Sequence, residues 1–182
     1  MKKPFYWKTE DLIVVGLFTA LNRVASLLVS LLGGGMNPIT MILKNAVSTA
    51  LLIVLVSRVR RFGILVLYTL ISHAVGFLVS GGYMISLLPA FLLSGLICDT
   101  LIAVTGGYRK LSAVVFGMVL YDLLGRLLAL SFSWLVLRES PAMFMIGAAI
   151  VAVGYIGCLL IGVPCGIRFV KELRHAGIIR EI

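Results

Sequence analysis

Charged residues are scarce in this sequence. They make up 13% of the 182 residues, whereas hydrophobic residues make up 61% and the mean hydropathy is +1.14. Soluble domains carry about 25% charged residues, because they need a polar surface. This composition excludes a soluble enzyme and a disordered chain. Cysteine is also rare, and the three cysteines lie inside apolar runs, which excludes a disulfide scaffold and a zinc site. They are Cys98, Cys158 and Cys165.

The motifs that carry common membrane-protein chemistry are missing as well. There is no GxxxxGK[ST] phosphate loop, so the chain is not expected to bind ATP by itself. HExxH and GxSxG are absent, as are an arginine ladder typical of voltage sensors and a TVGYG-like filter. We therefore expect no cofactor, no metal site and no catalytic residues.

Long apolar runs dominate what is present. A membrane-spanning helix needs about 20 mostly apolar residues, and six runs meet this requirement. The sequence therefore predicts an all-α integral membrane protein, with residues 1–182 forming one six-helix domain. Residues 166–182 are predicted to form an amphipathic cytoplasmic tail. The expected spans are residues 11–32, 38–56, 62–79, 85–104, 112–135 and 142–163.

Basic residues indicate the orientation of these spans. Of the 16 Lys and Arg, 12 lie before the first span, after the last, or in the two connections on the same side of the membrane. The opposite connections contain only Arg138. Because cytoplasmic loops are enriched in Lys and Arg, both termini are predicted to be cytoplasmic. The expected location is the plasma membrane of a prokaryote.

Several ionisable residues fall at membrane depth, where each one needs a partner or a function. At about 1.5 Å per helical residue, four basic or potentially basic residues fall in the middle and outer part of the membrane. Only Asp122 is an acid at similar depth. The four are Arg23, Lys44, His73 and Arg126. Because positive charge is in excess, a cavity among them would favour an anion.

Other interpretations of these residues stay open. Asp122 and Arg126 are four residues apart, so they have the spacing of an ion pair within one helix. Lys44 has a stem long enough to reach the outer headgroups. His73 is either a ligand contact or an interior histidine whose hydrogen bonds are satisfied within the protein. Asp99 lies near the inner side, where it either bonds a neighbouring helix or meets a cation.

Two connections on the outer side add candidate ligand contacts. The segment from Gly33 to Asn37 contains three glycines, so it is either a lid over the cavity or an ordinary turn. Asn37 at its end is a candidate binding residue. Tyr83, in the next outer connection, is either a stacking partner for a ring or an interfacial aromatic.

The stretch from Trp7 to Leu21, WKTEDLIVVGLFTAL, resembles the opening of substrate-capture (S) components of energy-coupling factor (ECF) transporters. Gly16 and Ala20 match the small-residue motif of that family's first helix. The segment from Lys171 to Ile178, KELRHAGI, is similar to the ending of the Trep_Strep-type members. The resemblance implies a compact six-helix protein that binds a vitamin or other micronutrient from the exterior. It also implies docking, through Gly16 and Ala20, onto a membrane T subunit that carries two ATPases.

The leading hypothesis is therefore an S component of an ECF-type ABC importer for an anionic micronutrient, without enzymatic activity. The binding residues are predicted to come from the set Arg23, Asn37, Lys44, His73, Tyr83, Asp122 and Arg126. The alternative is a stand-alone secondary transporter in which Asp122 and His73 relay protons. A membrane enzyme that uses Asp99, Asp122 and His73 is a third hypothesis.

Overall fold

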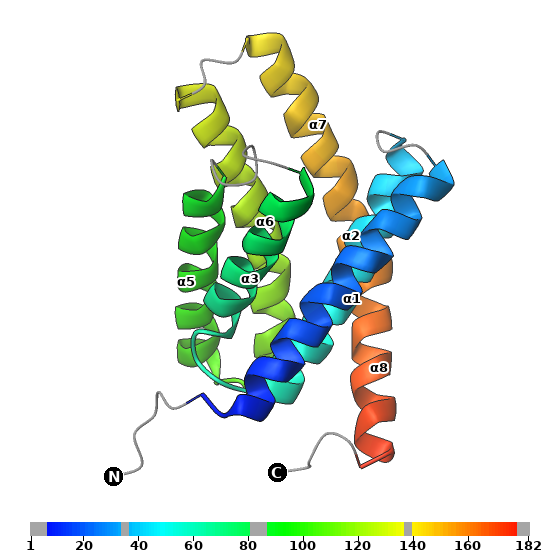
Figure 1. Cartoon of the computed structure of the whole chain (residues 1–182), viewed down its shortest axis with the longest axis vertical. Coiled ribbons are helices and arrows are strands. Elements are labelled where there is room, and N and C mark those ends of the chain that lie inside the picture. Colours follow the sequence, from blue (N-terminus) through cyan, green and yellow to red (C-terminus); the bar gives the residue numbers. More distant parts are fainter. Residues whose placement is uncertain (1–6, 34–36, 81–86, 137–139, 178–182) are drawn as a thin grey trace.

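The computed structural model describes residues 7–33, 37–80, 87–136 and 140–177, and these residues form helices and short connections without a strand. The helices pack side by side into an elongated bundle (Figure 1). The all-α, six-helix membrane fold predicted from the sequence is confirmed, with the last span built from three consecutive segments. The elements are α1 (Thr9–Gly33), α2 (Pro38–Val59), α3 (Ile64–Ser80), α5 (Leu88–Thr105), α6 (Leu111–Val136), α7 (Pro141–Gly157), the π-helical turn η1 (Cys158–Gly162) and α8 (Val163–His175).

Side chains and prolines fix where two of these helices begin. Asn37 precedes α2 and its side-chain oxygen accepts a hydrogen bond from the N–H of Ile39 at 3.2 Å. Ser140 caps α7 in the same way, accepting from the N–H of Met143 at 3.4 Å. Each cap is followed by a proline, whose fixed φ suits the first turn and whose missing N–H would have no partner there. The cap and the proline together therefore set where α2 and α7 begin.

The core lies toward the end of the bundle at which the described chain begins and ends, which we call the inner end (Figure 1). There α2 is surrounded by the other helices, and Ile53, Leu55 and Val56 are completely buried. Ile64 and Leu65, at the start of α3, are completely buried against them. Many large apolar side chains on the outside of the bundle remain exposed, as hydrocarbon-facing surfaces require.

Asp99 is part of this inner core and has a structural role. It is completely buried, and its Oδ2 accepts hydrogen bonds from the N–H groups of Leu65 at 3.1 Å and Val66 at 3.4 Å. Its Oδ1 accepts a hydrogen bond from the hydroxyl of Tyr108 at 2.7 Å. The carboxylate of α5 thus satisfies free N–H groups in the first turn of α3, where negative charge is stabilised. Of the two interpretations of Asp99, the bond to a neighbouring helix is the one observed.

The last helix runs without a break from Pro141 to His175 through the π-helical turn. This turn widens the helix so that Gly157 and Gly162, five residues apart, both face α2. A Cβ on Gly157 would lie 2.7 Å from the carbonyl oxygen of Ile42, and one on Gly162 would lie 2.9 Å from that of Ala46. Glycine is therefore needed at both positions for the two backbones to approach. The predicted amphipathic tail is the continuation of this helix, and its Val170 is completely buried in the core rather than lying free of the bundle.

Candidate functional site

A polar pocket lies near the outer end of the bundle, between α1, α2, α6 and α7. Its volume is about 190 Å³. Polar or charged side chains from three helices face it, in a part of the protein that is otherwise apolar. Its lining residues are Ser30, Thr40, Met41, Lys44, Asn45, Arg126 and Ile150.

Arg126 is the lining residue with the most contacts. Its Nε donates a hydrogen bond to Oδ1 of Asp122, one turn earlier on α6, at 3.1 Å. A terminal nitrogen donates to the side-chain oxygen of Asn45 on α2. The intrahelical ion pair predicted from the spacing is thus present, yet Arg126 still reaches the pocket. Oδ2 of Asp122 is buried and has no hydrogen-bond partner among the described residues, so this carboxylate is only partly satisfied by the protein.

Lys44 is the least satisfied of the cations. Its side chain is exposed and lines the pocket. Within the described ranges, its ammonium has neither a hydrogen-bond partner nor an ion-pair partner. The charges of Arg23 and Arg126 both repel it. A bound anion is the group that would relieve this repulsion.

Arg23 is not among the lining residues of this pocket, but its charge acts on Lys44. It donates from one terminal nitrogen to the carbonyl oxygen of Ser72 on α3 and to the hydroxyl of the same residue, the latter at 3.0 Å. Its Nε is buried and, among the described residues, has no partner. Asn22, next to it, donates to the hydroxyl of Tyr68 at 2.5 Å. Arg23 therefore ties α1 to α3, and within the described ranges no carboxylate is paired with its positive charge.

Of the other candidates that the structure describes, none is among the residues that line the pocket. Nδ1 of His73 lies 2.9 Å from the carbonyl oxygen of Thr69, and its ring packs at 5.2 Å from that of Phe91. These contacts fit the satisfied interior histidine. Asn37 is the exposed cap of α2 and does not line the pocket. Tyr83 and residues 34–36 of the proposed lid lie outside the described residues.

Sequence reasoning missed the uncharged polar residues of the site. Asn45, Ser30 and Thr40 each line the pocket, but single amides and hydroxyls within an apolar run give no distinctive signal. Gly154 on α7 was also missed, because a single glycine within an apolar run gives no distinctive signal either. A Cβ at this position would overlap the amide of Asn45 and lie 3.7 Å from a terminal nitrogen of Arg126. Glycine therefore allows α7 to close one side of the pocket.

The proposed docking residues lie on the surface of α1. Among the described residues, no atom outside the local backbone of α1 lies within 4 Å of a Cβ placed on Gly16, and Ala20 is exposed. The small residues thus do not serve packing within the described bundle. This face of α1 is open to a helix of another protein, as a small-residue pattern allows.

The fold and the sequence each have a counterpart among known proteins. The fold is similar to a solved structure entitled "Crystal structure of an S-component of ECF transporter", with a TM-score of 0.58 and 15% sequence identity. The similarity covers 96% of this chain and 89% of the other. Comparison with curated protein sequences gives no match. A family model described as "Hypothetical bacterial integral membrane protein (Trep_Strep)" matches residues 9–142. Because this match spans most of the sequence, the chain belongs to the Trep_Strep family of bacterial integral membrane proteins.

Proposed function

We propose that this protein is the substrate-capture component of an ECF-type ABC importer and that its substrate is a small organic anion such as a vitamin or other micronutrient. The observation that carries the proposal is the charge at the polar pocket. Lys44 and Arg126 line it, Arg23 lies within electrostatic range of Lys44, and Asp122 is the one carboxylate paired with these cations in the described bundle. Such an excess of positive charge favours an anionic ligand.

The pocket size suggests which part of the ligand it holds. At about 190 Å³ it is smaller than the roughly 300–1,000 Å³ of sites that enclose a whole drug-sized molecule. We therefore assign it the acidic end of the ligand, a carboxylate or phosphate. Lys44 would contribute a point charge, and the planar guanidinium of Arg126 a directional donor. Arg23, whose charge acts on Lys44, would add to the positive field.

One missing motif bears on which subunit would hydrolyse ATP. The sequence has no phosphate-binding loop, so ATP hydrolysis would come from two separate ATPase subunits joined through a membrane T subunit. Gly16 and Ala20 would form part of the surface that docks on that subunit. With both termini in the cytoplasm, the polar pocket faces the exterior, where the substrate is captured.

The secondary-transporter alternative requires a proton relay between Asp122 and His73. Asp122 is instead bonded to Arg126, and His73 is engaged with Thr69 and Phe91. The two hypotheses differ in their need for partners. Uptake by the purified chain alone in proteoliposomes would contradict the capture role, whereas uptake only with ATP and the partner subunits supports it.

The anion assignment is tested by binding to the purified protein. Native mass spectrometry of the freshly purified chain would identify any retained ligand. A panel of carboxylated vitamins, each paired with its neutral methyl ester, would then be titrated. We expect binding of an acid but not of its ester, and a loss of about tenfold to a hundredfold in Lys44→Gln, since a charged contact is worth about 1.5–3 kcal/mol. Lys110→Gln, in an inner connection, is the matched control and should bind as the wild type does. Equal binding of acid and ester would contradict the proposal.

A further inference from the structure

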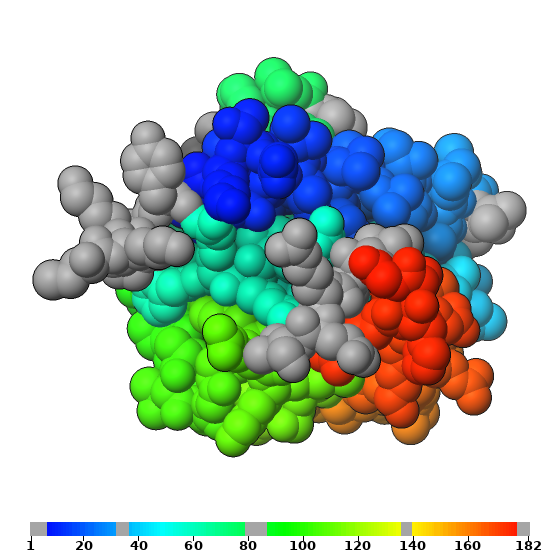
Figure 2. Space-filling model, turned by 90° about the horizontal axis from the view of Figure 1, so that it is seen from below, coloured from blue at the N-terminus to red at the C-terminus, as the bar shows by residue number. Residues whose placement is uncertain are grey.

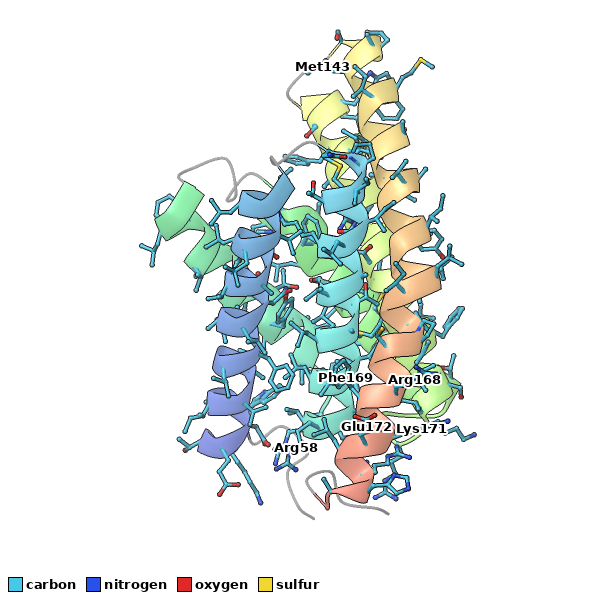
Figure 3. The ribbon with its side chains drawn as sticks, turned by 90° about the vertical axis from the view of Figure 1, so that its right-hand side faces the viewer. Arg58, Met143, Arg168, Phe169, Lys171 and Glu172 are labelled. Carbon is cyan, nitrogen blue, oxygen red and sulfur yellow. The ribbon has the colours of Figure 1, made fainter. Side chains whose placement is uncertain are left out.

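A second concave feature lies along α2, between α1 and α8. It is an apolar groove of about 540 Å³. Its floor is formed by a stripe of α2 that includes Ala50 and Val54, and its walls by Phe18 on α1 and by Cys165 and Phe169 on α8. In Figure 3, α1 and α8 stand on either side of α2, and Phe169 points into the space between them. Nothing in the polar pocket or its chemistry uses this groove.

The groove is elongated along α2, as a site for a hydrocarbon chain needs to be. Its floor extends along α2 from Leu43 to Val54, which is about 16 Å at 1.5 Å per residue. Three apolar residues that line the groove, Leu21, Leu43 and Phe169, are exposed, so the groove opens sideways to the bilayer.

The floor stripe becomes polar at the inner end. One turn beyond Val54 are Ser57, which is buried and whose hydroxyl has no hydrogen-bond partner among the described residues, and Arg58, which is exposed. On the opposite wall, Arg174 follows the groove residue Leu173, and its buried Nε has no partner in the described ranges. Figure 3 shows Arg58 at the base of the space between α1 and α8.

More positive charge gathers at the same place. Arg60 lies at the end of α2 and donates from Nε to the carbonyl oxygen of Ser57 at 2.9 Å. Burial and the nearby guanidinium groups of Arg174, Arg109 and Arg58 lower the pKa of Arg60. These groups come from three different parts of the chain, around the inner end that Figure 2 views from below. No ion pair neutralises Arg58 or Arg174 in the part of the protein that the structure describes.

We propose that the groove binds an anionic phospholipid, with one acyl chain between α1 and α8 and the phosphate beside Ser57, Arg58 and Arg174. The apolar length and the basic inner end are two independent features, and a phospholipid of the cytoplasmic leaflet combines both chemistries in one molecule. A zwitterionic lipid would fill the groove but leave the arginine charges unmatched. The proposal concerns a site separate from the polar pocket, so it does not rest on the substrate assignment.

Native mass spectrometry of the detergent-purified full chain tests the proposal with phosphatidylglycerol, phosphatidylcholine and glycerol phosphate as probes. We expect retention of phosphatidylglycerol well above that of phosphatidylcholine and no retention of glycerol phosphate. Arg58→Gln and Arg174→Gln should each lower retention about fivefold, from the known attraction of one basic residue to anionic lipid. Arg168→Gln and Lys171→Gln are matched controls on the exposed side of α8 (Figure 3) and should leave retention unchanged.

The native thiol of Cys165 gives a readout that needs no substitution. It lines the groove and is exposed, whereas Cys98 and Cys158 are buried. Phosphatidylglycerol should slow its alkylation by a maleimide at least severalfold more than phosphatidylcholine does. Equal protection by the two lipids, or binding of glycerol phosphate as strong as that of the lipid, would overturn the proposal. It would also be overturned if the groove excluded lipid and Ala50→Trp abolished assembly with a membrane partner, because a helix of that partner would then be the occupant.

Discussion

Arg126 joins two helices at the polar pocket by donating both to Asp122 on its own helix and to the side-chain oxygen of Asn45 on α2. The second bond is the one that fixes the guanidinium relative to Lys44, because Lys44 and Asn45 are adjacent on α2. The position of the two cations relative to each other is therefore set by one amide. This makes Asn45 a test of whether the pocket depends on its geometry as well as on its charge.

Asn45→Ala should weaken both stability and ligand binding. It leaves a partly buried guanidinium without its second acceptor, at a cost of about 1–3 kcal/mol, and it lets the side chain turn away from the pocket. The midpoint of thermal unfolding in detergent and the affinity for the retained ligand would be measured together. Ser131→Ala, which removes an exposed hydroxyl elsewhere on α6, should change neither. Unchanged affinity in a folded Asn45→Ala protein would remove the Arg126–Asn45 bond from the site.

Gly154 supports the same bond from the other side. Gly154→Ala places a methyl group into the amide of Asn45, so we expect it to destabilise the protein by about 1–3 kcal/mol, as overpacking of a core does. Gly16→Ala is the matched control. It makes the same substitution on α1, where the added Cβ meets no described atom of a neighbouring helix within 4 Å. It should be neutral or stabilise by up to about 1 kcal/mol through helix propensity. Equal effects of the two substitutions on the unfolding midpoint would contradict the close approach of α7.

These residues also show which features of the fold and the pocket can be predicted from the sequence. Apolar run length predicted the six helices because hydrocarbon thickness sets span length, and the four-residue spacing predicted the Asp122–Arg126 pair. Arg23 and Lys44 stood out because charge is rare in such runs. Asn45 and Gly154 did not, since their roles depend on which faces of α2, α6 and α7 meet. The π-helical turn was not predicted either, because an apolar run gives no signal for a change of helix type.

Asp99 is expected to matter for folding and not for ligand binding. Asp99→Ala removes the acceptor for two N–H groups at the start of α3, and loss of a helix cap costs about 0.5–2 kcal/mol. It also removes the shorter of the two hydrogen bonds that the hydroxyl of Tyr108 donates, and leaves the one to the backbone carbonyl oxygen of residue 99. Tyr108→Phe removes only that hydroxyl and should have a smaller effect on the unfolding midpoint. A loss of ligand affinity in folded Asp99→Ala protein would contradict its placement away from the site.

The docking face on α1 is separable from the polar pocket. Gly16→Leu adds a large side chain where the bundle leaves open space, so ligand affinity and stability should stay as in the wild type. Co-purification with a T subunit and its ATPases, and uptake into proteoliposomes, should fall, because the close helix contact is blocked. Ala103→Leu adds the same bulk at an exposed position of α5 and should leave assembly intact. Normal assembly by Gly16→Leu would exclude this face as the docking surface.

Arg23 distinguishes a direct ligand contact from a contribution through the field of the site. A guanidinium that binds the acid group directly would make Arg23→Gln cost about 2–5 kcal/mol in binding, the range for a buried charged contact that loses its partner. Its observed bonds are to Ser72, and it does not line the pocket. We therefore expect Arg23→Gln to lower affinity less than Lys44→Gln does, and to lower stability more, since Lys44 has no partner to lose among the described residues. Ligand titrations would compare the affinities of the two variants, and thermal unfolding would compare their stabilities. A larger affinity loss in Arg23→Gln, with stability intact, would show that the arginine leaves Ser72 and turns to the ligand when it binds.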